Sequence, residues 1–150
     1  MHKAAAFIAA VVFSAISVFA GHLTNVAGAS GIALDGYDPV AFFTDKKPVH
    51  GDPGIATTYL GATYLFASTE HKNTFEGNPE KYVPQFGGYC AFGASIGALF
   101  PVDVNTWQIR DGKLYLNLNP SILEAFNKDF RGNIAKSEKN WPDLVKKYSK

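Results

Sequence analysis

The chain is poor in sulfur, since its 150 residues include one cysteine, Cys90, and one methionine, Met1. A single cysteine excludes an internal disulfide, which is the common use of cysteine in exported proteins. Met1 precedes the expected mature chain, so copper sites built on thioether ligands are excluded as well. Whatever sulfur chemistry the mature protein has must therefore use Cys90.

The chain also has no excess of either charge, with 14 basic and 13 acidic side chains. The basic residues are scattered, and no basic stripe of the kind that binds nucleic acid is present. The sequence contains no GxGxxG motif, phosphate-binding loop or zinc-protease helix. We therefore expect no nucleic-acid partner, and nothing in the sequence indicates nucleotide binding or metalloprotease chemistry.

The amino terminus has the pattern of a signal peptide. Lys3 is followed by an apolar run over residues 4–20 and then by Gly21. We predict cleavage after Ala20, with a cut after Ala29 as an alternative and an uncleaved anchor as a second alternative. The expected location is periplasmic or secreted, with no stable membrane span once the signal is removed.

Beyond the signal, the pattern predicts a linker over residues 21–33 and one domain over residues 34–150. Asp-Gly at 111–112 between two alternating segments is a strong hairpin signal. Runs of hairpin, helices, hairpin and helices predict an α+β fold, a small antiparallel sheet built from two hairpins and covered by several short helices. Strands are expected at 57–60, 63–66, 106–110 and 113–118, and helices at 38–43, 68–75, 79–82, from 89, at 120–130 and at 132–140, with Pro142 opening a last turn.

The segment 84–97 surrounds Cys90 with small residues, and Gly87 and Gly88 precede it. We predict a loop that enters a helix near Tyr89, so that Cys90 lies where free backbone amides favour an anion. Cys90 would then be a nucleophile or a metal ligand with a partly exposed thiol. The alternative is a small buried hydrophobic residue.

His71 is the first candidate partner, because it could orient or deprotonate Cys90 or join it on a metal ion. The alternative is a structural or surface histidine. Asp38 is interpreted as a helix cap rather than a base. The tyrosines are interpreted as core or rim aromatics whose hydroxyls could donate hydrogen bonds near the thiol. The supporting residues are Tyr37, Asp38, Tyr64, Tyr89, Gly87 and Gly88.

Three segments carry a resemblance to the YHS domain family: 37–40 (Tyr-Asp-Pro-Val), 64–75 (Tyr-Leu-Phe-Ala-Ser with His71 and Phe75) and 78–82 (Asn-Pro-Glu-Lys-Tyr). The chain is most similar to exported single-domain members, some of which carry selenocysteine at the position of Cys90. This resemblance implies a redox or nucleophilic role for that position. Metal-binding members of the family have cysteines where this chain has Ala41 and Ala67.

Three functions remain open. The first is a periplasmic thiol redox protein in which Cys90 is oxidised to a sulfenic acid and reduced by a small thiol or a protein redox partner. The second is a module that binds a soft metal, copper or zinc, through Cys90 and His71. The third is an interaction or scaffold domain that has no chemistry of its own.

Overall fold

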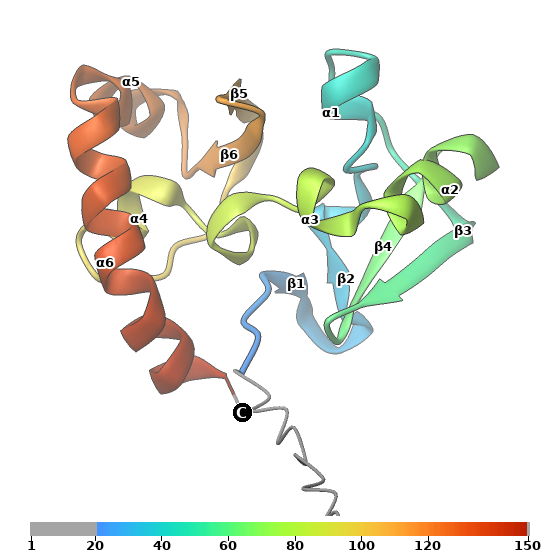
Figure 1. The fold of residues 1–150 in the computed structure, drawn as a ribbon, viewed down its shortest axis with the longest axis horizontal. Coiled ribbons are helices and arrows are strands. Elements are labelled where there is room, and N and C mark those ends of the chain that lie inside the picture. Colours follow the sequence, from blue (N-terminus) through green and yellow to red (C-terminus); the bar gives the residue numbers. More distant parts are fainter. Residues whose placement is uncertain (1–20, 150) are drawn as a thin grey trace, which may run out of the picture.

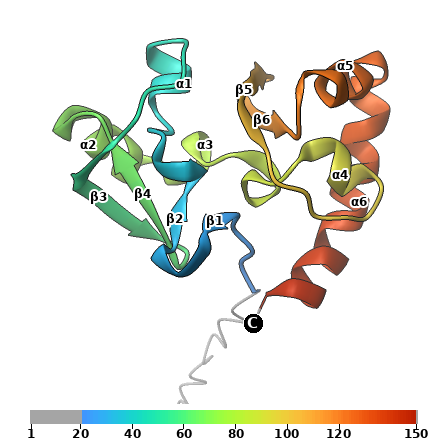
Figure 2. The ribbon, with the colours of Figure 1, turned by 180° about the vertical axis from the view of Figure 1, so that it is seen from behind.

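The computed structural model describes residues 21–149, and the predicted signal peptide, residues 1–20, lies outside the described residues. The described chain folds into two halves (Figure 1). One half contains β1 to β4 with α1 to α3, and the other contains α4 to α6. The hairpin of β5 and β6 lies between them in both views (Figure 2).

The first half is built on a four-stranded sheet with the strand order β1-β2-β4-β3. Its two longest strands form the predicted hairpin, β3 (Asp52–Tyr59) at the edge of the sheet and β4 (Ala62–Phe66) next to it. The sheet is mixed, because β2 (Ile32–Ala33) pairs parallel with β4 through Ile32 and Thr63. β1 (Val26–Ala27) then pairs antiparallel with β2.

The prediction of a linker over residues 21–33 is wrong. β1, a 3₁₀ turn over Gly28–Ser30 and β2 all lie within it. Just before β1, the Asn25 amide donates to the Gly87 carbonyl at 2.8 Å, and the Asn25 side-chain amide donates to the Gly88 carbonyl at 3.3 Å. Strands of two residues are too short to produce an alternating apolar pattern in the sequence. The sequence therefore gives no sign that this segment is part of the fold.

Three short helices cover this sheet: α1 (Ala41–Thr44), α2 (Thr69–Gly77) and α3 (Pro79–Tyr82). A further 3₁₀ turn spans Leu34–Gly36. Ser68 caps α2 by accepting a hydrogen bond from the backbone amide of His71 at 3.1 Å. Phe75 of α2 is fully buried against Tyr64 and Phe66 of β4. The packing of Phe75 fixes α2 on the sheet.

The second half contains α4 (Ala91–Ser95), α5 (Pro120–Lys128) and α6 (Phe130–Tyr148), preceded by a 3₁₀ turn over Gln85–Gly88. The predicted hairpin is present as β5 (Asp103–Arg110) and β6 (Lys113–Asn117). Leu114 and Leu116 belong to the core of the sheet half, whereas Tyr115 belongs to the core under the helices. The alternation along β6 therefore holds the two halves together.

Two details of the predicted architecture are wrong. The two hairpins form separate sheets rather than one, since β5 and β6 pair only with each other in the described chain. α6 runs through Pro142 without ending there. Proline removes one backbone donor from a helix, and burial of Leu144 against the core keeps the following turn in place. The α+β class itself is confirmed.

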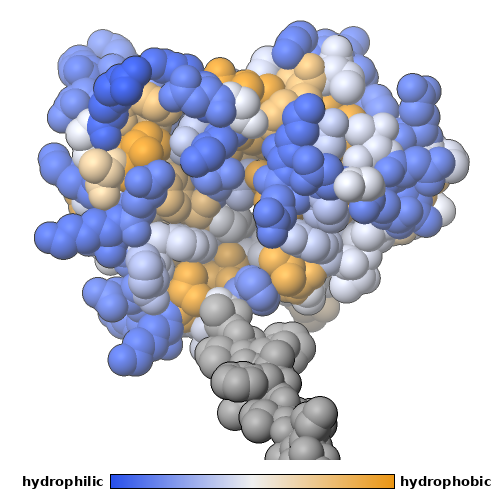
Figure 3. All heavy atoms as spheres, in the orientation of Figure 1, coloured by the Kyte–Doolittle hydropathy of each residue, from blue (hydrophilic) through white to orange (hydrophobic). Residues whose placement is uncertain are grey.

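Polar residues cover most of the visible face, and apolar residues show in separate patches (Figure 3). No helix within residues 21–149 is long and apolar enough to cross a membrane.

Candidate functional site

Cys90 stands at the start of α4, as predicted. It is the capping residue of that helix, and its Sγ accepts a hydrogen bond from the Gly93 amide at 3.4 Å. The Cys90 amide donates to the Phe100 carbonyl at 3.0 Å. The expectation of a partly exposed thiol is wrong, because Cys90 is 1% exposed. The segment 96–100 folds back on it, with the Phe100 ring and the Ala98 carbonyl packed against Gly93.

Asn117, at the end of β6, is the side chain that contacts Cys90. The thiol donates to Asn117 Oδ1 at 3.6 Å, and the Phe92 amide donates to the same oxygen at 3.1 Å. Asn117 is fully buried, and its Nδ2 finds no acceptor among the described residues. Buried amides are almost always paired, so an unpaired donor on the side chain that contacts the thiol is unusual.

Thr106 of β5 determines where Asn117 lies. Its hydroxyl accepts a hydrogen bond from the backbone amide of Asn117 at 2.8 Å and donates one to the backbone carbonyl of Asn117 at 2.8 Å. The pairing of β5 and β6 shifts register between Asp103 and Gln108, and Thr106 bridges the irregular stretch. Asn117 shares the face of β6 that carries Tyr115, which is the face that meets the helices.

Sequence reasoning did not single out Asn117. The sequence does carry one signal, an asparagine at the end of an alternating strand. A buried polar side chain at such a position indicates a specific hydrogen-bond partner. Neither the register shift nor the contact with Cys90, which lies 27 positions earlier, is visible in a sequence pattern.

His71 belongs to another cluster. Its Nδ1 lies 2.6 Å from Oδ2 of Asp38, a fully buried carboxylate. Its Nε2 lies 3.3 Å from Thr44 Oγ1 and 3.8 Å from Asp45 Oδ1. The two ring nitrogens of His71 therefore face different groups: Nδ1 faces the Asp38 carboxylate, and Nε2 faces the Thr44 hydroxyl.

The Asp38 carboxylate is saturated with donors. Oδ1 accepts from the backbone amides of Val40 at 2.8 Å and Ala41 at 3.3 Å, so Asp38 pairs two free amides at the start of α1, although the capping residue of that helix is Val40. Oδ2 accepts from the Ala67 amide at 2.9 Å in addition to His71. Asp38 thereby joins α1, the end of β4 and the start of α2.

The structure does not bring Cys90 and His71 together. Within residues 21–149 no hydrogen bond or ion pair joins them, and their bonded partners belong to different halves. Nor does any cluster of three His, Cys, Asp or Glu side chains suited to a metal ion occur in this part of the chain. The geometry therefore gives no support to the pairing of Cys90 with His71, either as a catalytic pair or as a metal site.

The other predicted supporting residues have packing or backbone roles in the fold. Tyr37 stacks on His50 with ring centroids 4.0 Å apart. Gly87 and Gly88 have φ values of +60° and +80°, and a side chain on Gly87 would collide with the Leu23 carbonyl. Burial raises the pKa of Tyr89 above its ordinary value. None of these residues contacts the Cys90 thiol through a hydrogen bond in the described chain.

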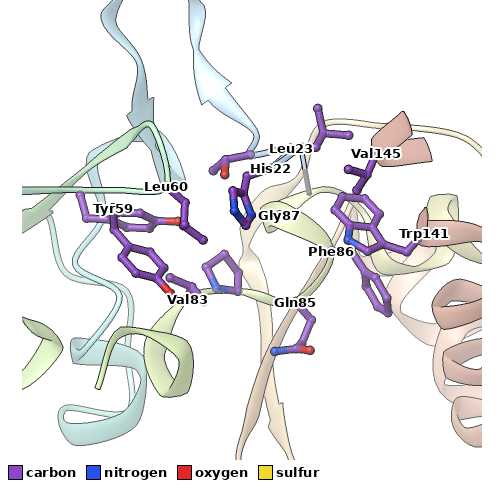
Figure 4. Close-up of a pocket in the computed structure, with 14 residues that line it drawn as sticks. His22, Leu23, Tyr59, Leu60, Val83, Gln85, Phe86, Gly87, Trp141 and Val145 are labelled. Carbon is purple, nitrogen blue, oxygen red and sulfur yellow. The ribbon is translucent and has the colours of Figure 1, made fainter. Parts of the chain in front are cut away.

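A cleft of about 220 Å³ separates the two halves. Figure 4 shows His22 in its middle, with Tyr59 and Leu60 on the side of the sheet and Phe86 and Trp141 on the side of the helices. Tyr64 also lines the cleft. Burial, with a smaller contribution from Tyr59, raises the pKa of Tyr64 to about 12.

Comparison with known proteins adds nothing to this description: no family model, no curated protein and no solved structure matches the chain.

Proposed function

We propose that this protein is an exported, YHS-type domain that acts as a single-thiol redox protein, with Cys90 as the reacting group. The observation that supports the proposal is the unpaired Nδ2 donor of Asn117, the side chain whose Oδ1 contacts the Cys90 thiol. A reduced thiol offers this donor no strong acceptor. An oxygen added to Sγ would be such an acceptor, so oxidation of Cys90 would complete the hydrogen bonding of the site.

The reaction consumes a hydroperoxide, the oxidant that we propose. The Cys90 sulfur attacks one peroxide oxygen, the O–O bond breaks, and an S–O bond forms. The departing oxygen, hydroxide from hydrogen peroxide or alkoxide from an organic hydroperoxide, takes the thiol proton and leaves as water or an alcohol. Cys90 is thereby oxidised to a sulfenic acid while the peroxide is reduced. Asn117 Nδ2 then donates to the new oxygen.

Reduction of the sulfenic acid requires an external thiol, because the chain has no second cysteine. The external thiol attacks the Cys90 sulfur, the S–O bond breaks, and water and a mixed disulfide are formed. A second external thiol cleaves that disulfide, which restores Cys90 and releases the oxidised external thiol. The partner is therefore a small thiol or a protein thiol of the periplasm or the medium.

Access to Sγ depends on the segment 96–101. Ile96 and Phe100 are 64% and 39% exposed, so the segment has solvent on its outer side. The segment is held to Cys90 and Gly93 by a few backbone bonds, among them Cys90 to Phe100 at 3.0 Å and Ala98 to Gly93 at 2.9 Å. Opening of this short segment would uncover the thiol, and the apolar contact that it would break is that of the partly buried Leu99 with the core under the helices.

The proposal is tested by treating the native protein with hydrogen peroxide and trapping the sulfenic acid with a cyclic 1,3-diketone. We expect one adduct, on Cys90, detected by mass spectrometry, and none in Cys90→Ser. Asn117→Asp keeps an acceptor for Phe92 but removes the donor. It should lower the trapped fraction by about fivefold, the equivalent of one hydrogen bond of about 1 kcal/mol.

Asn105→Asp is the matched control, because Asn105 is exposed on β5 and its substitution adds the same charge away from the thiol. Circular dichroism would verify that each variant is folded. Trapping that occurs only in denaturant, or that is equal in wild type and Asn117→Asp, would overturn the proposal and leave the interaction-domain alternative.

A further inference from the structure

The residues that directly follow the predicted signal peptide are part of the fold. A side chain on Gly21 would collide with Ser149 Oγ at the end of α6, so the backbone of Gly21 lies against that helix. Figures 1 and 2 both show the start of the described chain beside the carboxyl end of α6. The chain then continues through Asn25 into β1.

This arrangement discriminates between the two predicted cleavage sites. A cut after Ala29 would remove β1 and both hydrogen bonds from Asn25 to the turn at Gly87 and Gly88. A cut after Ala20 removes none of the described structure. The fold therefore favours Gly21 as the first residue of the exported protein.

An amino-terminal Gly-His pair has three nitrogen donors in a row. They are the free amine of Gly21, the backbone amide nitrogen between the two residues, and the imidazole of His22. The three close two fused chelate rings around one metal ion and lie near one plane. Such planar nitrogen sets select Cu(II) or Ni(II) among the divalent ions, and Cu(II) binds the more strongly.

The surroundings of these donors are open to a metal ion. Gly21 and His22 are exposed, and within residues 21–149 no hydrogen bond or ion pair involves the His22 ring. Figure 4 shows this ring in the cleft between the halves. The site also lies at the carboxyl end of a helix of 19 residues, where the helix dipole favours a cation.

We propose that the exported protein binds one Cu(II) ion through Gly21 and His22 at the mouth of the cleft. This inference rests on the export included in the proposed function but not on the chemistry of Cys90. Binding displaces the protons of the Gly21 ammonium group and of the His22 amide, which solvent accepts. The fourth in-plane position is left for solvent or an external ligand.

The experiment begins with the full 150-residue chain expressed in a host that exports it. Amino-terminal sequencing of the exported protein should give Gly-His-Leu. Titration with CuSO₄ should then show one equivalent bound, with the visible absorption band and the nitrogen hyperfine pattern of a planar nitrogen complex. All titrations are done in parallel in Cys90→Ser, so that the thiol neither reduces nor binds the copper.

Two substitutions and one chemical modification locate the site. His22→Gln should lose the one-equivalent step, and acetylation of the amino terminus should abolish it as well. His50→Gln is the matched control, because His50 is also exposed, and it should bind as wild type does. If Cys90→Ser binds one equivalent while wild-type Cys90 resists peroxide, the copper site stands and the proposed redox function fails.

The inference is overturned by a first residue other than Gly21. It is overturned equally by the absence of stoichiometric binding to the protein that begins at Gly21, or by binding that survives both His22→Gln and acetylation. Such surviving binding would place the ion elsewhere in the chain.

Discussion

Within residues 21–149, one carboxylate and one side-chain amide are completely buried: Asp38 in the sheet half, and Asn117 on the face of β6 that meets the helix half. Asp38 accepts four hydrogen bonds, from three backbone amides and from His71. Asn117 accepts two bonds through Oδ1, whereas its Nδ2 donates none within the described chain. We call Asp38 and its four donors the complete centre, because every hydrogen-bonding position there is used. We call Asn117 and its contacts the incomplete centre, because the Nδ2 donor has no acceptor among the described residues.

This difference in hydrogen bonding indicates a structural role for Asp38 and a chemical role for the site at Asn117. A fully satisfied buried carboxylate has its capacity used by the fold, so it stabilises the native state and offers little to a ligand. A buried donor without an acceptor costs stability on folding, which is easiest to understand if another state of the protein uses it. His71 is bound to the complete centre and Cys90 to the incomplete one, which explains why we place the chemistry at Cys90.

The largest expected effect tests the complete centre. Asp38→Ala leaves three backbone amides and His71 without their acceptor, so the free energy of unfolding should fall by about 3–5 kcal/mol. Urea denaturation would measure this. Asp45→Ala, which removes an exposed carboxylate 3.8 Å from His71, is the control and should cost less than about 1 kcal/mol. Equal losses in the two variants would contradict the role of Asp38.

The second prediction concerns the amino-terminal segment that joins the halves. Gly87→Ala combines a φ of +60° with a collision against the Leu23 carbonyl, and it should destabilise the protein by about 2–3 kcal/mol. Gly97→Ala is the matched control, because Gly97 has a φ of +74° and nothing within 4 Å of the added carbon. It should cost about 1 kcal/mol. If Gly87→Ala is no worse than the control in thermal unfolding, the segment 21–27 is not packed as described.

The third prediction uses Tyr64 in the cleft. Since its pKa is raised to about 12 in the native state, its stabilising contribution is complete below pH 10 and is lost as the pH rises toward 12. At pH 11 the free energy of unfolding should be lower by about 1 kcal/mol from this group. Tyr64→Phe should remove that part of the decline between pH 9 and 11. An unchanged decline in the variant would show that other tyrosines, such as Tyr115, account for it.

The smallest effect is expected at the incomplete centre. Asn117→Leu keeps the branched shape of the side chain, and it removes the unpaired donor together with the acceptor for Phe92. These two changes oppose each other, so the free energy of unfolding should change by less than about 1 kcal/mol. A loss as large as that of Asp38→Ala would mean that Asn117 is also a structural centre, and the contrast between the halves would disappear.

Much of the frame could be predicted from the sequence because its signals are local. The Asp-Gly turn at 111–112, the helix predicted over residues 68–75 and the start of a helix near Cys90 all depend on neighbouring residues, and the structure has each of them. The ordered segment 21–33 and the separation of the two hairpins depend on long-range pairing, which no local pattern encodes.

The features of the candidate site also fall into two groups, those that local sequence predicts and those that depend on long-range contacts. Cys90 was found because it is the only cysteine, and its helix position was found from the glycines before it. Its burial and its contact with Asn117 arise from the register shift in the β5–β6 hairpin and from the fold of residues 96–100. His71 was paired with Cys90 on residue type alone, and the structure bonds it to Asp38 instead.

The most direct test is a crystal structure of the protein after treatment with hydrogen peroxide. The account predicts an oxygen atom on Sγ of Cys90 at a hydrogen-bonding distance from Asn117 Nδ2, about 2.7–3.2 Å. An unmodified Cys90 in crystals whose solution sample was oxidised elsewhere would contradict it. So would an oxidised sulfur whose oxygen points away and leaves Nδ2 unpaired.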